Sequence, residues 1–344
     1  MAAAYMTVVA PLISVCVANY NGMDVIDECL QSVLKQEGQI CVEILVHDDA
    51  SSDGSAMYIR DHYPEVRLIV SANNVGFCVA NNRMAAQAKG QYLLLLNNDA
   101  ALYPDALKTL LEEATCLGKP SIFTLPQFDA TIGCIVDRGC LLDPFYNPVP
   151  NLNPQRRDVA MVIGACFWIP RNIWEELGGF PEWFGSIAED MYLCCQARWA
   201  GYAVQVLPVS GYRHVQGASF GGNKPQGHRL NSTFRRRYLS ERNKLQVMLL
   251  MSPGMRLAWL LPLHLMLCLL ETLALCLARA SLDYGLQVQW PAWKHVWKMR
   301  AQLCQKRKNL QQCGRITARD YGLAFTRFPR KLALLWKYGI PHLR

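Results

Sequence analysis

Three clusters of polar residues interrupt apolar segments in the first hundred residues of this 344-residue chain. They occupy residues 19–22 (NYNG), 46–55 (VHDDASSDGS) and 97–99 (NND). A carboxylate at a strand end can accept hydrogen bonds from a nucleotide base or ribose, and a second one can hold a divalent cation beside phosphates. The clusters therefore indicate a site for a nucleotide diphosphate. Taken singly, Asp49 and Asp53 could instead form an Asx turn and a helix cap.

These clusters follow apolar segments that alternate with amphipathic ones through residues 12–125. The pattern predicts strands over 12–18, 42–47, 66–70 and 92–96, and helices over 24–36, 53–63 and 77–88. Unbroken apolar strands that alternate with helices are typical of a parallel sheet covered on both faces. Because ligands bind beyond the carboxyl ends of such strands, we expect the three clusters to meet in one crevice. Residues 145–158, rich in proline and asparagine, are expected to form a loop or lid.

The composition and the missing motifs exclude or disfavour several classes of protein. Hydrophobic residues make up 51% of the chain and charged residues 18%, which excludes overall disorder. The sequence has neither GxxxxGK(S/T) nor a GxGxxG after the first strand, which disfavours a P-loop kinase or ATPase and a dinucleotide oxidoreductase. The 14 cysteines lack zinc-ligand spacing, and Cys16, Cys41 and Cys166 lie in apolar segments. We therefore expect buried, reduced thiols in a cytoplasmic protein.

Charge divides the chain into a predicted domain over 1–223 and a basic, helical region over 224–344. The first part holds 13 Lys and Arg against 23 Asp and Glu, whereas the second holds 22 against 4. A helix is predicted over 233–251. This asymmetry indicates that the second part contacts an anionic partner.

The apolar segment 257–278 and the residues after it indicate the nature of this anionic partner. Its 22 residues could just cross a bilayer of ~30 Å hydrocarbon thickness, although it contains Pro262, His264 and Glu271. An interfacial or re-entrant segment and a buried helix of a soluble domain are the alternatives. Trp290, Trp293 and Trp297 lie among Lys294, Lys298 and Arg300, a mixture that suits lipid headgroups, and no nucleic-acid-binding motif accompanies it. We therefore expect an anionic membrane surface as the partner, and no nucleic acid.

The apolar N-terminus lacks basic residues, so we do not predict a signal peptide.

The order of six motifs resembles the inverting glycosyltransferases of family 2, over roughly residues 13–222. The matching segments are ISVCVANYNG, VHDDASSDGS, NNVGFCVANN, NND, the stretch from GACFWIP through GGF to the ED pair, and RHVQGASF. NNVGFCVANN is similar to a segment of rhamnosyltransferase-like members. The resemblance implies an α/β GT-A fold, which is Rossmann-like with a mostly parallel sheet and helices on both faces.

The resemblance also implies a donor site. Asp48 would contact the nucleotide base, with Asn19 and Tyr20 lining the same pocket. Asn97 and Asn98 would add contacts to the donor. Asn97 replaces the first carboxylate of the family's DxD motif, so the site is expected to hold its metal weakly.

The same resemblance assigns the metal and the base. Asp99 would coordinate Mg²⁺ or Mn²⁺ at the donor diphosphate, and His214 would contact the metal or the diphosphate. Asp190 would be the catalytic base and Glu189 its neighbour, because an inverting transfer needs one carboxylate that deprotonates the acceptor hydroxyl opposite the leaving group. Without the resemblance, two acids at a helix start are explained by the helix dipole, and a single histidine by packing.

We therefore expect a transferase that moves a hexosyl or deoxyhexosyl group from a dTDP- or UDP-sugar to a saccharide acceptor. The acceptor is expected to be lipid-linked, at the cytoplasmic face of a membrane, in cell-surface polysaccharide synthesis. One alternative is a polyprenyl-phosphate sugar synthase, which would need a basic acceptor pocket such as residues 156–157 or 235–237 could supply. The other is a non-enzymatic, nucleotide-sugar-binding membrane protein.

Overall fold

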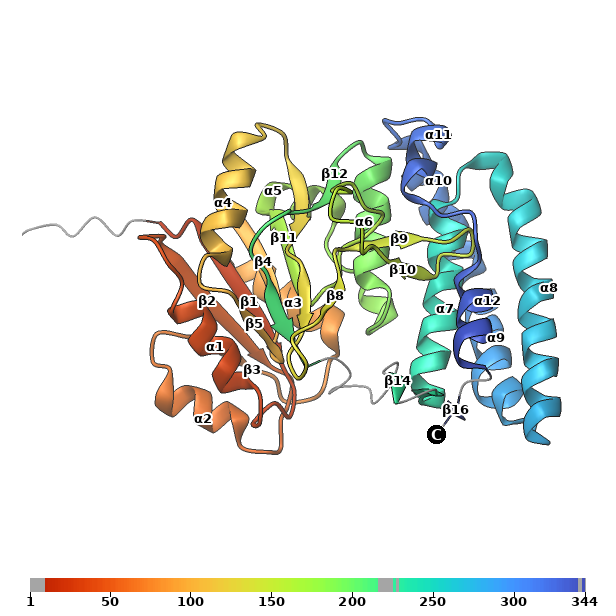
Figure 1. Ribbon diagram of the computed structural model, residues 1–344, viewed down its shortest axis with the longest axis horizontal. Helices are drawn as coiled ribbons and strands as arrows, with labels where there is room; N and C mark the ends of the chain where they lie inside the picture. Colours follow the sequence, from red (N-terminus) through yellow and green to blue (C-terminus); the bar gives the residue numbers. More distant parts are fainter. Residues whose placement is uncertain (1–9, 216–224, 227–228, 340–341, 344) are drawn as a thin grey trace, which may run out of the picture.

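The centre of the molecule is a seven-stranded sheet in a computed structural model that describes residues 10–215, 225–226, 229–339 and 342–343 (Figure 1). The strands are β1 (Ile13–Asn19), β2 (Val42–Asp48), β3 (Arg67–Val70), β4 (Tyr92–Asn97), β6 (Ser121–Thr124), β11 (Cys166–Pro170) and β12 (Ala203–Val206). Their order is β12-β6-β11-β4-β1-β2-β3, and only β11 runs antiparallel to its neighbours in this sheet. The prediction of a mostly parallel sheet is confirmed.

Helices cover both faces of this sheet, as expected. One face carries α1 (Ile26–Leu34), α2 (Ser55–His62) and α4 (Ala106–Cys116), and the other carries α3 (Phe77–Gln87), α5 (Arg171–Leu177) and α6 (Glu189–Trp199). Neighbouring residues of a strand point to opposite faces, so Val15 packs in the core on the side of α1, α2 and α4, and Cys16 packs in the core on the side of α3, α5 and α6. Cys16 and Cys166 are buried as expected, whereas Cys41 is exposed, so the expectation for Cys41 is wrong.

A smaller sheet begins directly after the NND cluster, and the sequence analysis did not predict it. Its strands are β5 (Ala100–Leu102), β7 (Gln127–Asp129), β8 (Ile135–Asp137) and β13 (Tyr212–His214), in the order β5-β13-β7-β8. In the β5–β13 pair, His214 lies opposite Ala100. This register brings His214 beside Asp99, although 115 positions separate them in the sequence.

The predicted loop or lid over 145–158 is in part a hairpin strand. β9 (Cys140–Leu142) pairs with β10 (Pro148–Pro150), and the turn between them packs against the C-terminal helices. Asn147 Oδ1 accepts a hydrogen bond from Lys244 Nζ at 2.6 Å, and Tyr146 Oη accepts one from Ser252 Oγ at 3.1 Å. These buried contacts make the turn a fixed support for the helices.

The C-terminal region is helical, as predicted, and packs on the same core as the sheet. Its helices are α7 (Phe234–Met251), α8 (Gly254–Arg279), α9 (Trp290–Lys298), α10 (Arg300–Gln312), α11 (Ala318–Tyr321) and α12 (Arg330–Tyr338). Short elements complete the chain: η1 (Glu182–Phe184), η2 (Gly285–Gln289), η3 (Gly322–Ala324), β14 (Pro225–Gln226), β15 (Arg229–Ser232) and β16 (His342–Leu343). Leu245 and Met251 of α7 join the core cluster that contains Leu95 of β4. The predicted boundary at 223/224 lies outside the described residues, and the division into two domains stays a prediction.

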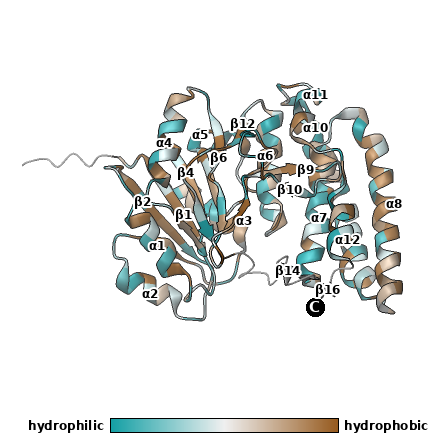
Figure 2. Ribbon diagram, viewed as in Figure 1, coloured by the Kyte–Doolittle hydropathy of each residue, from teal (hydrophilic) through white to brown (hydrophobic). Residues whose placement is uncertain are grey.

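Helix α8 is mostly apolar along its length (Figure 2), with one side packed against the protein and an exposed apolar side. Buried positions recur along one side at Leu260, His264, Cys268 and Leu275, and Glu271 Oε2 on this side accepts a hydrogen bond from Lys331 Nζ at 2.6 Å. The outer side consists of exposed apolar residues, among them Trp259, Met266, Leu267, Leu269, Leu270, Leu273 and Leu277. Among the described residues, Gly254–Ala278 is the one helix long and apolar enough to cross a membrane, judged by length and composition alone.

Candidate functional site

Asp48 and Asn19 end two neighbouring parallel strands, and the β1–β2 register sets them side by side. Asn19 Nδ2 donates to Asp48 Oδ1 at 2.9 Å, and Ser51 Oγ donates to the same oxygen at 2.6 Å. Asn98 Nδ2 donates to Asn19 Oδ1 at 2.9 Å, and this bond links the end of β1 to the NND turn. Asn19, Asp48 and Asn98 are all buried, so the three polar clusters form one network with fixed orientations.

Two other acids of the VHDDASSDGS segment support the backbone. Asp49 accepts hydrogen bonds from the amides of Val75 at 2.7 Å and Gly76 at 2.9 Å, so it holds the start of α3. Asp53 Oδ1 accepts from the Ser55 amide at 3.0 Å at the start of α2. Asp49 and Asp53 therefore stabilise the backbone at the starts of the two helices. Tyr20 is 51% exposed beside the network, and its role at the base stays a prediction.

The NND turn and β13 bring together the residues predicted to bind metal. His214 Nε2 lies 3.0 Å from Asp99 Oδ1, and Asn97 Nδ2 lies 3.5 Å from the same nitrogen. Among the described residues, the buried atoms Asn97 Oδ1 and His214 Nδ1 have no hydrogen-bond partner. The carboxylate and the amide oxygen are ligand types that suit Mg²⁺ or Mn²⁺, and the imidazole can add a ligand for Mn²⁺, so the residues present fit such an ion. Gly217 and Ser219 of the RHVQGASF motif lie outside the described residues.

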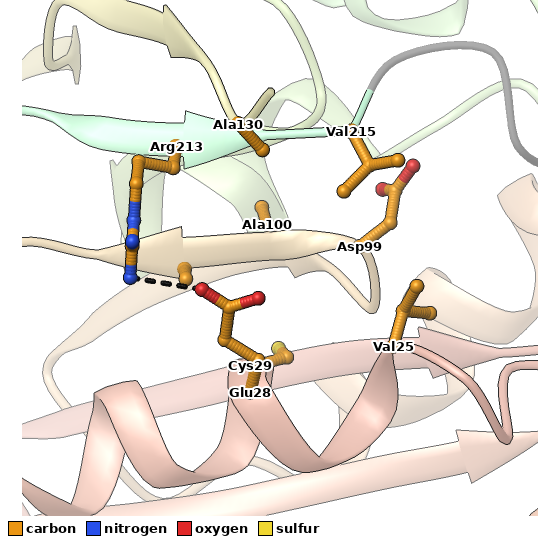
Figure 3. A pocket seen from close by; sticks show the side chains of 9 residues that line it. Val25, Glu28, Cys29, Asp99, Ala100, Ala130, Arg213 and Val215 are labelled. Atoms are coloured by element: carbon orange, nitrogen blue, oxygen red, sulfur yellow. Dashed lines mark ion pairs between the residues drawn. The ribbon is translucent and has the colours of Figure 1, made fainter. Parts of the chain in front are cut away.

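A small hollow borders Asp99 on the side of α1 (Figure 3). Glu28 of α1 and Arg213 of β13 face each other across it and form an ion pair of 2.8 Å. Asn19, Asp48 and Asp190 do not line this hollow. We therefore do not assign the donor to this hollow, and Glu28 offers a matched control for Asp99.

Glu189 and Asp190 open α6, as predicted, and both are buried. Asp190 Oδ2 accepts a hydrogen bond from the Gly164 amide at 3.0 Å, and Oδ1 accepts one from the Met191 amide at 2.7 Å. Burial raises the pKa of Asp190, which these amides partly offset. Burial raises the pKa of Glu189 well above its usual range, and the charge of Asp190 raises it further. The pair can therefore hold one proton, which suits one base and one neutral neighbour.

A short series of hydrogen bonds joins the three acidic centres around the end of β4. Asp48 is linked through Asn19 to Asn98, which precedes Asp99. Asp190 is linked to Gly164, and the carbonyl of Ala165 accepts from the Asn97 amide at 3.2 Å. Sequence reasoning missed Gly164, because a backbone amide carries no signature in the side-chain pattern. The structure thus brings together Asn19, Asp48, Asn97, Asn98, Asp99, Glu189, Asp190 and His214.

Comparisons with known proteins fit this arrangement. Residues 14–178 match the family model described as Glycosyl transferase family 2. The succinoglycan biosynthesis protein ExoO of Rhizobium meliloti (strain 1021) is 36% identical over 109 residues, which cover 31% of this chain and 31% of that protein. The N-acetylglucosaminyl-diphospho-decaprenol L-rhamnosyltransferase of Mycobacterium tuberculosis (strain ATCC 25618 / H37Rv) is 25% identical over 224 residues, which cover 54% of this chain and 70% of that protein.

The fold has counterparts among solved structures. A crystal structure of GalNAc-T7 with UDP, GalNAc and Mn²⁺ superposes with a TM-score of 0.55 at 18% sequence identity. The superposition covers 70% of this chain and 48% of that one. At this level of identity the likeness concerns the fold alone.

Proposed function

We propose that the chain is an inverting transferase of glycosyltransferase family 2, whose family model residues 14–178 match, with the GT-A fold. It moves a hexosyl or deoxyhexosyl group from a dTDP- or UDP-sugar to a saccharide acceptor. The observation that carries this proposal is the convergence of Asp48, Asp99 and Asp190 around the end of β4. The names of the two relatives support a deoxyhexosyl donor, a lipid-linked acceptor and a role in polysaccharide synthesis.

In this mechanism Asp48 accepts a hydrogen bond from the nucleotide base, and the Asn19–Asn98 network fixes its orientation. Asp99, Asn97 and His214 would hold Mg²⁺ or Mn²⁺. When bound, the metal would offset the negative charge that develops on the departing diphosphate. His214 holds the carboxylate of Asp99 in place for this contact.

Asp190 takes the proton from the attacking hydroxyl of the acceptor. The amides of Gly164 and Met191 hold its carboxylate in one orientation. The raised pKa of Asp190 makes it a stronger base than an exposed aspartate, because the protonated form of its carboxyl group is favoured. Glu189 in its protonated form adds no further negative charge beside the base.

The test is a screen of nucleotide sugars with Mn²⁺ or Mg²⁺. We expect the full chain to release nucleoside diphosphate from one dTDP- or UDP-linked hexose far faster than from the others, and only with metal present. The measurement is diphosphate release together with donor binding by calorimetry. Binding of a nucleotide sugar without turnover on any saccharide acceptor would instead favour the non-enzymatic alternative.

A polyprenyl-phosphate acceptor is the second candidate, and the charge of Arg236 favours it. Arg157 pairs with Glu113, and Arg156 donates to the Leu323 carbonyl at 2.9 Å, so both arginines serve structural contacts. Arg236 is half-buried, and its positive charge partly opposes the burial that raises the pKa of Glu189, so this cation lies near the neighbour of the predicted base. Transfer to polyprenyl phosphate that carries no prior sugar would support this candidate.

We also propose that the C-terminal region lies on an anionic membrane surface. The outer face of α8 is apolar, and Trp290 and Trp297 are exposed on the same region, which carries the positive charge excess of the chain. The inward side of α8, which carries His264 and Glu271, packs against the protein. This supports a helix that lies in the interface, because one side faces protein rather than lipid. Basic residues near anionic headgroups contribute about 1 kcal/mol each.

Vesicle binding tests this surface. Replacing Leu270 and Leu273 together with glutamate is expected to weaken binding to phosphatidylglycerol vesicles by about tenfold or more, because it removes apolar burial from the outer face. The control is Leu152→Glu, since Leu152 is an exposed leucine of the hairpin region. Binding should also strengthen at low salt and nearly vanish on neutral vesicles. Equal binding to neutral and anionic vesicles would contradict the electrostatic part of the proposal.

A further inference from the structure

The loop that leads into α6 carries backbone strain immediately before the two acids. Ile187 has φ 71° and Ala188 has φ 69°, the left-handed region that side chains rarely adopt. A β-branched residue such as Ile187 is strained there because its side chain crowds the backbone. Such a conformation persists only where surrounding contacts impose it. We name this segment the 184–188 loop.

Two neighbouring residues of α7 supply those contacts. Asn243 Nδ2 donates to the carbonyls of Ile187 at 2.7 Å and Ser186 at 2.9 Å. Arg242 Nη2 donates to the carbonyl of Phe184 at 2.6 Å. Asn243 is fully buried and Arg242 is 8% exposed, so water does not replace these bonds.

The two side chains also orient each other. Arg242 Nε donates to Asn243 Oδ1 at 2.8 Å, which leaves the amide nitrogen of Asn243 directed at the loop carbonyls. An arginine that donates from two nitrogens in fixed geometry is well suited to such a clamp. The clamp therefore holds the loop from Phe184 to Ile187, while Gly164 holds the carboxylate of Asp190 just beyond the loop.

We propose that Asn243 and Arg242 are positioning residues that hold the 184–188 loop, and through it Asp190, in the geometry needed for proton abstraction. This inference rests on the proposed function. It assigns to the C-terminal helix α7 a role in the reaction itself, because the acids lie on one element and their clamp lies on another. A shift of about 1 Å in a reacting group is enough to cost about 10²-fold in rate.

The sharpest variant is Asn243→Asp, which keeps the shape and the bond from Arg242 but removes the donor. We expect kcat to fall about 10- to 100-fold, while the dissociation constant of the nucleotide-sugar donor stays within about twofold. Loosening of the loop admits water to Asp190, and because burial raises its pKa, the acid limb of the kcat/KM profile should move to lower pH in Arg242→Lys, which keeps the net charge.

Two further variants complete the experiment. Arg242→Lys removes the bond that orients the Asn243 amide. This variant tests the same clamp if Asn243→Asp fails to fold. Gln246→Met is the matched control, because Gln246 is fully buried on the same helix and accepts a hydrogen bond from Trp183 Nε1 at 3.0 Å instead of from the loop. Gln246→Met should lower the unfolding temperature without moving the pH profile.

The outcomes distinguish failure of the proposed transferase function from failure of the clamp. If the wild-type chain transfers no sugar from any donor, the proposed function and the clamp both fail. If wild type is active but kcat and the acid limb of both α7 variants match those of Gln246→Met, the clamp alone is overturned. A kcat loss with a shifted acid limb and unchanged donor affinity supports it.

Discussion

Replacing Asp190 with asparagine is expected to lower kcat by about 10²–10⁴-fold, the range that a general base contributes. The amide has nearly the same shape but cannot take up the proton of the acceptor hydroxyl. Donor affinity should stay within about twofold, because the carboxylate of Asp190 bonds to the Gly164 and Met191 amides and not directly to Asn19 or Asp48. Initial rates over a range of acceptor concentrations and donor binding by calorimetry measure the two effects.

The pH dependence provides a second readout of the same variant. Burial raises the pKa of Asp190, so the acid limb of kcat/KM in the wild-type chain should lie above the normal range of an aspartate. As the pH falls through that raised pKa, the base becomes protonated and activity is lost. The Asp190→Asn variant should lack this limb.

A matched control separates lost chemistry from lost stability. Asp143 is fully buried, and its carboxylate accepts from the backbone amides of Phe145 and Asn147 at 2.8 Å each. Asp143→Asn disturbs a comparable set of bonds in the β9–β10 hairpin and should lower the unfolding temperature with little loss of kcat. A larger loss of kcat from Glu189→Gln than from Asp190→Asn would assign the base to Glu189 instead.

The strands and their polar ends were predictable because the information is local. β1, β2 and β4 each contain a continuous apolar segment, and a polar cluster directly follows each one, so the ends of these strands could be located within a residue or two. The family resemblance supplied the order of the motifs. Together they were sufficient to expect Asn19, Asp48 and Asp99 at one edge of the sheet.

The parts that sequence reasoning missed depend on contacts between distant segments. The strands of the small sheet have three residues each, too few for a periodic pattern, although their pairing is what sets His214 beside Asp99. The clamp on the 184–188 loop lies more than fifty residues downstream, inside a helix whose pattern indicates only packing. Likewise, the polar residues on the inward side of α8 could be interpreted only once Lys331 of α12 was known to contact Glu271.

The second large effect concerns the metal residues. Asp99→Asn is expected to lower kcat/KM by about 10²–10³-fold, because a metal at a departing diphosphate contributes several kcal/mol and each ~1.4 kcal/mol is tenfold. Asp99 is the single carboxylate of the NND turn, since Asn97 and Asn98 are neutral. Loss of its charge therefore removes most of the electrostatic attraction for a divalent cation.

The metal titration decides whether this loss belongs to Asp99 as a ligand. In Asp99→Asn, half-maximal activity should require at least tenfold more Mn²⁺ than in the wild-type chain, whereas His214→Gln should show a smaller shift because the carboxylate remains. Glu28→Gln is the control, because it removes another carboxylate beside the same hollow, and that carboxylate pairs with Arg213. If chelation with EDTA left the wild-type rate unchanged, or if Glu28→Gln shifted the Mn²⁺ requirement as much as Asp99→Asn, Asp99 would act by orienting His214 rather than by holding a cation.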